Sequence, residues 1–179
     1  PKGIYFVSKG KVKIYQTNEL GKEFITELHK EGDFFGYLSL LKDEKYSSTA
    51  STLEDSEIYM IPKEDFFSLI YKNAEVSRKF IEILSNNLLE NEKQLVKLAY
   101  NSVRKRVAEA LIKLSDKYKK DEDKRFSMNI SREDLANIVG TATETVIRTL
   151  SDFKEDKLIE INGGTITIVN YDKLLKLKN

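Results

Sequence analysis

The first third of the chain alternates apolar and polar residues over short stretches that end in polar turns. Val12 and Ile14, for example, are flanked by lysines, which is typical of a strand with one buried and one wet face. The same pattern predicts strands at Ile4–Val7, around Val12 and Ile14, and at Phe24–Leu28, Ser48–Leu53 and Ile58–Ile61. Many short strands broken by polar turns favour a jelly roll. These strands are too few to close one, and no Met begins the chain, so we expect that an N-terminal part is missing.

Helical spacing replaces this alternation at Pro62. Helices are predicted at Pro62–Tyr71, Glu75–Tyr100 and Val103–Tyr118. The last of them carries an inward apolar face made of Val107, Ala110, Leu111 and Leu114. A break near Asn101 and Ser102 separates it from the long helix, so we expect a domain boundary and hinge at Tyr100–Ser102.

Six residues of the long helix recur at steps of three and four, as in a coiled-coil seam. They are Ile81, Leu84, Leu88, Asn91, Leu95 and Leu98. This spacing predicts a parallel homodimer, with Asn91 fixing the register or reaching a ligand beside the helix. The alternative is that the helix packs only on its own β-domain.

Residues 129–169 combine two short helices, a tight turn and a hairpin. Ser131 is expected to cap the first helix, which ends at Gly140, and the second begins three residues later. Their inward residues are Leu135, Ile138 and Val139 on the first helix, and Val146, Leu150 and Phe153 on the second. The hairpin turns at residues 162–164, and a short strand is predicted before the helices at Phe126–Ile130. This order of parts predicts a winged helix-turn-helix.

The second helix presents outward a set of side chains suited to DNA bases: Thr143, Glu144, Ile147 and Arg148. A Glu can accept a hydrogen bond from the amino group of cytosine, and an Arg can bind guanine through two hydrogen bonds. An apolar side chain such as that of Ile147 can contact a thymine methyl group. The pattern indicates a reader of double-stranded DNA. The alternative is a small packed helical domain with ordinary surface charges.

Composition narrows the remaining function classes. The 179 residues suffice for two small domains. No apolar run approaches the roughly 18 residues of a membrane span, so we expect a cytoplasmic protein without a membrane role. Because Cys is absent, these residues form no disulfide or cysteine-held cluster.

The one histidine, His29, cannot make a zinc site alone and is expected to be a surface imidazole. Since no nucleophile–base pair or phosphate loop is visible, neither an enzymatic role nor a cofactor is expected.

The charge is split only weakly along the chain. Residues 1–100 hold 14 basic and 16 acidic side chains, a net −2, and residues 101–179 hold 16 and 13, a net +3. Basic clusters at Arg104–Arg106 and Lys117–Lys120 are candidates for DNA contact or for solvated helix faces.

Four stretches carry a resemblance to a known family: GIYFVSKGKVKIY, EGDFFGYLSLL, KLAYNSVRKRVAEALIKL and ISREDLANIVGTATETVIRTL. Together with the order of parts, they resemble the Crp–Fnr superfamily of bacterial transcription regulators. The resemblance implies an α+β chain with three parts. Residues 1–72 would form a cyclic-nucleotide-binding-like jelly roll, residues 73–100 a dimerisation helix, and residues 101–179 the winged helix-turn-helix.

The resemblance also implies a homodimer on a palindromic operator, with RNA polymerase as a candidate partner. Glu144 and Arg148 match the family's base-reading pair, whereas Thr143 stands where some members have an Arg. Contacts to the DNA backbone are expected from two helix-start residues, Arg132 and Thr145, and from the wing, Asn162, Gly163, Gly164 and Thr165. The open alternative is a ligand-sensing or protein-docking module that does not read DNA.

The effector site departs from the cyclic-nucleotide binders it resembles. Tyr37 stands where they have a Glu for the ribose, and Ser47, followed by Ser48, stands where they have an Arg for the phosphate. Asn91 and Glu92 match helix residues that contact the base. The expected pocket residues are Gly36, Tyr37, Leu38, Tyr46, Ser47, Ser48, Asn91 and Glu92. We expect a degenerate pocket for another small-molecule effector or for none. The alternatives are a loop over a filled core and a cyclic-nucleotide receptor with an altered pocket.

Overall fold

A computed structural model describes residues 1–119 and 125–178. Lys120 of the second basic cluster lies outside the described residues. The chain divides into two compact units, Pro1–Gln94 and Leu95–Asn179. This division falls inside the long helix rather than at its end. In the described part of the chain, no helix has both the length and the apolar character needed to cross a membrane.

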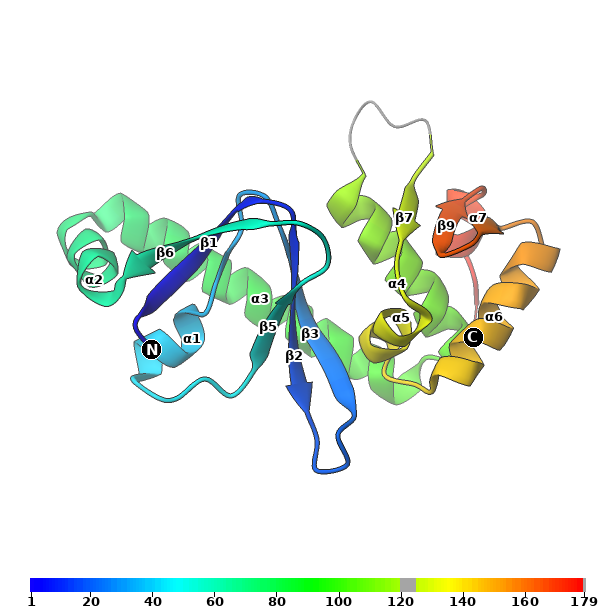
Figure 1. The fold of residues 1–179 in the computed structure, drawn as a ribbon, viewed down its shortest axis with the longest axis horizontal. Helices are drawn as coiled ribbons and strands as arrows, with labels where there is room; N and C mark the ends of the chain where they lie inside the picture. Colours follow the sequence, from blue (N-terminus) through cyan, green and yellow to red (C-terminus); the bar gives the residue numbers. More distant parts are fainter. Residues whose placement is uncertain (120–124, 179) are drawn as a thin grey trace. The chain divides into compact units, whose positions relative to one another are not determined.

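The first unit contains two three-stranded antiparallel sheets (Figure 1). One has the order β4-β1-β6, made of β4 (Phe34–Phe35), β1 (Gly3–Lys9) and β6 (Glu57–Pro62). The other has the order β3-β2-β5, made of β3 (Glu23–Lys30), β2 (Lys11–Thr17) and β5 (Thr49–Thr52). All five predicted strands are therefore confirmed. The two-residue strand β4 was not predicted.

Two apolar clusters hold this unit together. Ile4 of β1 pairs with Ile61 of β6, and the first cluster gathers Ile4, Tyr37, Leu40 and Phe66. Leu40 belongs to a short helix, α1 (Tyr37–Lys42), and Phe66 to α2 (Lys63–Lys72). The second cluster joins the inner faces of the two sheets through Val7, Val12, Ile14 and Phe35. The α2 helix confirms the prediction at Pro62–Tyr71, whereas α1 was not predicted.

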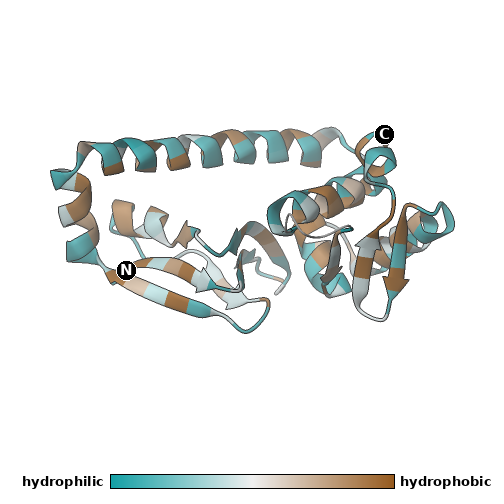
Figure 2. Ribbon diagram, turned by 90° about the horizontal axis from the view of Figure 1, so that it is seen from above, coloured by the Kyte–Doolittle hydropathy of each residue, from teal (hydrophilic) through white to brown (hydrophobic). Residues whose placement is uncertain are grey.

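Apolar and polar residues are interspersed along the long helix α3 (Ala74–Tyr100; Figure 2), and only part of its apolar stripe is packed against the β-domain. Phe80 and Leu84 pack against the first cluster. By contrast, Ile81, Leu88 and Leu95 are 62%, 61% and 67% exposed. Of the six predicted seam positions, Leu84 thus contacts its own β-domain, because it shares a helix face with Phe80. The exposed positions leave a stripe uncovered within the single chain, and the dimer seam stays a prediction.

The second unit contains the predicted winged helix-turn-helix. Its helices are α4 (Val103–Tyr118), α5 (Arg132–Val139), α6 (Thr143–Glu155) and the unpredicted α7 (Tyr171–Leu175). Its sheet has the order β7-β9-β8, made of β7 (Ser127–Asn129), β9 (Thr165–Ile168) and β8 (Ile159–Asn162). The predicted inward residues of α4, α5 and α6 are all buried. The predicted break at Asn101 and Ser102 is also present, and the Ser102 hydroxyl caps α4 by accepting from the backbone N–H of Lys105.

The two ends of α5 have the predicted chemistry. The Ser131 hydroxyl accepts a hydrogen bond from the backbone N–H of Asp134 at 2.8 Å, which satisfies one of the free donors at the helix start. At the other end, Gly140 adopts a left-handed conformation, with φ of 72°, that favours glycine. Its N–H donates to the Ala136 carbonyl at 2.8 Å. This left-handed residue lets the chain reverse between α5 and α6 within a few residues.

Candidate DNA-binding surface and ligand pocket

The α6 helix separates a buried face from an exposed one. Val146, Leu150 and Phe153 are almost fully buried. Glu144, Ile147 and Arg148 are exposed, and their spacing of three and four residues places them on one face. The other two predicted α6 contacts, Thr143 and Thr145, are half-buried. The exposed face therefore combines an acceptor, an apolar group and a two-pronged donor, which is the chemistry needed to read base edges in a major groove.

Arg104 of α4 fixes the far end of α6. Its guanidinium bonds Asp152 at 3.3 Å and Asp156 at 2.6 Å, and it lies 4.7 Å from the centroid of the Phe153 ring. Arg106 donates to the backbone carbonyls of Val139 at 2.7 Å and Gly140 at 3.4 Å, at the end of α5. The basic cluster at Arg104–Arg106 is thus a brace within the domain. The partners of these two arginines are 33 to 52 residues away, and the two alternatives raised from sequence, DNA contact and a solvated face, stay predictions.

Arg132 connects the start of α5 to the wing. Its guanidinium donates to the carbonyl oxygens of Ile130 at 3.2 Å, Gly164 at 3.3 Å and Gly163 at 3.4 Å. The wing turn itself is exposed at Asn162, Gly163 and Gly164. Because these acceptors are neutral carbonyls, Arg132 retains a full positive charge beside the wing. Its predicted contact with a DNA phosphate stays a prediction.

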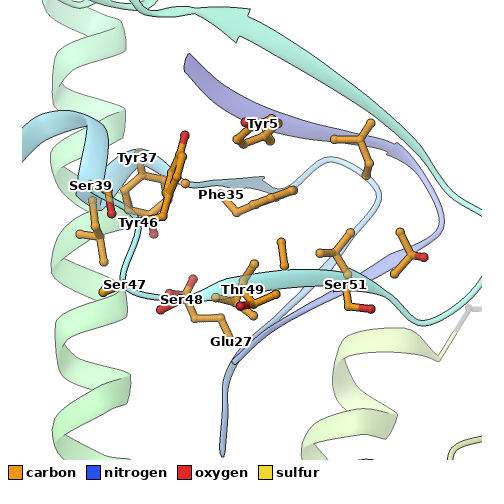
Figure 3. A pocket seen from close by; sticks show the side chains of 17 residues that line it. Tyr5, Glu27, Phe35, Tyr37, Ser39, Tyr46, Ser47, Ser48, Thr49 and Ser51 are labelled. Carbon is orange, nitrogen blue, oxygen red and sulfur yellow. The ribbon is translucent and has the colours of Figure 1, made fainter. Parts of the chain in front are cut away.

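A cavity of about 400 Å³ opens in the first unit (Figure 3). Six of the predicted pocket residues line it: Gly36, Tyr37, Leu38, Tyr46, Ser47 and Ser48. The other two, Asn91 and Glu92, are exposed on α3 and are not among its lining residues. The helix residue that reaches the pocket wall is instead Asn87, which lies on the same face of α3 as Phe80 and Leu84.

Tyr37 closes one end of this pocket at the start of α1. Its side chain is only 2% exposed, its hydroxyl accepts a hydrogen bond from Asn87, and its ring meets Phe80 edge-on at 5.3 Å. Burial, helped by the nearby carboxylate of Glu27, raises the pKa of Tyr37 to about 12. A neutral hydroxyl therefore occupies the position at which the cyclic-nucleotide binders are expected to carry a carboxylate.

Three aromatic rings form a wall of the pocket. Tyr5 stacks on Phe35 with 5.2 Å between ring centroids, and Tyr46 lies 6.5 Å from Tyr5 at a tilt. The Tyr46 hydroxyl donates to the carbonyl of Gly3 at 3.2 Å, and burial raises its pKa to about 12. Gly36, with φ of 82°, lies against this wall, where a Cβ would come within 3.0 Å of the Tyr5 ring.

Sequence reasoning missed several lining residues, above all Glu27. On β3, Glu27 pairs with the buried Ile14 of β2, and His29 pairs with the buried Val12, so both face the pocket side; this pairing is not visible in the local sequence. The expectation of a surface imidazole at His29 was wrong. The ring is 7% exposed, it stacks on Phe35 at 5.5 Å, and its Nε2 lies 3.1 Å from Glu27 Oε2.

The two parts of the chain match two known domain families. Residues 1–73 match the cyclic nucleotide-binding domain, and residues 105–177 match the Crp-like helix-turn-helix domain. The chain thus combines a domain of the nucleotide-binding type with a DNA-binding helix-turn-helix, which is the composition of a transcription regulator.

Individual proteins similar to this chain identify its family. It is 32% identical to the cyclic AMP receptor protein of Thermus thermophilus over 165 residues, covering 92% of this chain and 74% of that protein. It is 28% identical to the fumarate and nitrate reduction regulatory protein of Vibrio cholerae, covering 98% and 71%. The structure of FixK2 from Bradyrhizobium japonicum has the same fold, with a TM-score of 0.87, 23% identity, and coverage of 99% and 88%. The chain belongs to the Crp–Fnr family of transcription regulators, and its relatives are not enzymes.

Proposed function

We propose that this regulator binds a palindromic operator as a homodimer and reads bases through Glu144, Ile147 and Arg148. The observation that carries this proposal is the exposed face of α6, where these three side chains stand together on a helix held by Arg104. Thr143 is half-buried at the helix start and would contact the edge of the same site. A cytosine amino group, a thymine methyl group and a guanine edge are the matching features on DNA.

Contacts to the sugar-phosphate backbone would set the register of this reading. The exposed wing turn, Asn162–Thr165, offers backbone N–H groups and a hydroxyl, and Arg132 holds that turn while keeping its own charge. Thr145 lies in the first turn of α6, where helix N–H groups favour an anion. These groups contribute affinity without sequence preference, so their part of the binding depends on salt.

The homodimer would form along the exposed stripe of α3. Ile81, Leu88 and Leu95 recur every seven residues and are all exposed in the single chain. Asn91 and Leu98 complete the predicted seam, and Leu84 supports it from the side of the β-domain. A two-fold dimer presents two α6 helices to successive half-sites, so a palindromic operator follows. RNA polymerase is the further partner proposed for such a regulator.

The pocket would hold an effector other than a cyclic nucleotide, or none. Its lining contains neither Arg nor Lys to neutralise a cyclic phosphate, and Tyr37 and Ser47 occupy the positions of the charged partners. The loss of such a charge-assisted hydrogen bond costs about 1.5–3 kcal/mol, or roughly ten- to hundredfold in affinity.

Selection of random duplex DNA with the full chain tests the proposal. We expect a palindrome whose half-sites lie about one helical turn apart, and binding that weakens steeply with salt. Recovery of a single site without an inverted repeat would contradict the proposal that a two-fold dimer binds a palindromic operator. Recovery of no consensus would favour a ligand-sensing or protein-docking module that does not read DNA.

A further inference from the structure

The lining of the β-domain pocket is acidic. It is made of seventeen residues, all within the described part of the chain, and Glu27 is the only one with a charged side chain. The others are apolar, aromatic or hydroxyl-bearing. The nucleotide-binding domains it resembles are built for an anion, so the sign of the lining charge is opposite to theirs.

The neighbours of Glu27 do not reverse this charge. His29 Nε2 lies 3.1 Å from Glu27 Oε2, and His29 Nδ1 lies 3.8 Å from Asp33 Oδ2. This group holds two carboxylates and one imidazole. Its net charge is therefore −2 when His29 is neutral and −1 when His29 is protonated. These three groups together repel an anionic ligand in either state and attract a cation.

The aromatic wall suits the same kind of ligand. The faces of Tyr5, Phe35 and Tyr46 can each hold an ammonium group through their ring electrons or pack against an apolar body. Ser48 and Thr49 add hydroxyl acceptors in the lining near the start of β5. A primary ammonium has three N–H donors, and a carboxylate accepts several hydrogen bonds, so Glu27 can serve both His29 and a ligand.

We propose that the pocket binds a small organic cation, with its ammonium group on Glu27 and its apolar or aromatic body against Tyr5, Phe35 and Tyr46. The cavity of about 400 Å³ lies within the range of small-molecule sites. This inference rests on the proposed function, in that it assigns a ligand class to the effector pocket of a DNA-binding regulator.

A series of ligands that differ only in charge tests the inference. Phenethylamine, 2-phenylethanol and 3-phenylpropanoate would be titrated into the full chain by calorimetry, each to low-millimolar concentration. We expect phenethylamine to bind about tenfold or more tightly than the other two, since the charged hydrogen bond to Glu27 is available to it alone. Equal binding of all three, tighter binding of the carboxylate, or no binding of phenethylamine would overturn the inference.

Two variants test whether the preference for phenethylamine depends on Glu27. Glu27→Gln should bring the affinity of phenethylamine down to that of 2-phenylethanol. Glu23→Gln is the matched control, because Glu23 lies on the same strand but pairs with Lys13 and does not line the pocket. It should keep the full charge preference. If Glu27→Gln does not fold, the charge series on the unmodified chain still decides the question.

Operator binding is measured in parallel with ligand binding, so that a failure of the ligand assignment can be told from a failure of the proposed DNA-binding function. Specific DNA binding without a preference for phenethylamine would overturn the ligand assignment alone. A Glu27-dependent preference for phenethylamine supports the ligand assignment, and a failure to bind any DNA would count only against the proposed function.

Discussion

Asn87 of α3 donates a hydrogen bond from its side-chain amide to the hydroxyl of Tyr37, a residue of the pocket wall fifty positions earlier in the chain. The ring of Tyr37 also packs edge-on against Phe80 of the same helix. Tyr37 therefore belongs to the pocket wall and also contacts the long helix. A ligand that displaces Tyr37 must change a contact on α3 at the same time.

Tyr37→Phe should lower the free energy of unfolding of the first unit by about 0.5–1.5 kcal/mol, because it removes the partner of a partly buried amide. Calorimetric unfolding of the full chain measures this loss. Tyr59→Phe is the matched control, since Tyr59 is 60% exposed and should be neutral. Equal stability of both variants would mean that the Tyr37–Asn87 contact contributes nothing.

Arg148→Ala should weaken specific operator binding by about 1–3 kcal/mol and relax the preference at one G·C pair in each half-site. The reason is that Arg148 is exposed on the same face of α6 as Glu144. Repeating the DNA selection with the variant measures both effects.

Lys154→Ala, at the opposite end of α6, supplies the control for this experiment. Its consensus should match that of the unmodified chain. An unchanged consensus for Arg148→Ala as well would remove Arg148 from the base-reading set.

Leu88→Asp should dissociate the dimer, since two carboxylates would face each other in an apolar seam. Leu88 is exposed in the single chain, so the folded protomer should tolerate the change. Sedimentation equilibrium measures the assembly. Leu69→Asp, at another exposed apolar residue, on α2, should leave the dimer intact. If instead Leu69→Asp dissociates it, the interface lies on α2.

Cyclic AMP should not raise operator affinity. The pocket lining offers no basic side chain to its phosphate, and the Glu27 carboxylate repels it. A ligand shifts an equilibrium only through different affinities for the two states, so one that barely binds shifts little. Operator titrations with and without millimolar cyclic AMP check this. A tenfold tightening would show that backbone N–H groups alone hold the phosphate.

Local chemistry made much of the fold predictable. Ser131 and Gly140 mark the two ends of α5 through side-chain and backbone rules that act within a few residues. The wing hairpin was predicted from the glycines at 163 and 164, which lie between two segments of alternating apolar and polar residues. The inward faces of α4, α5 and α6 followed from helical periodicity.

Contacts between distant residues were beyond this reasoning. Arg104 and Asp156 are 52 positions apart, and nothing near either residue indicates the other. The pairing of β1 with β6, the burial of His29 and the position of Glu27 in the pocket depend equally on how strands meet in space. The family resemblance marked Asn91 and Glu92 as the helix residues near the pocket. Asn87, one turn earlier on the same face of α3, is the residue that contacts the pocket wall.

The brace formed by Arg104, Asp152 and Asp156 includes none of the three side chains proposed to read bases on α6. Exposed substitutions that disturb no such contact usually change stability by less than about 0.5 kcal/mol. Positions 144, 147 and 148 can therefore vary with little cost to the domain that carries them. On the proposed function, substitutions at these three positions would give descendants of one gene new target promoters, while the scaffold stays under separate selection for folding.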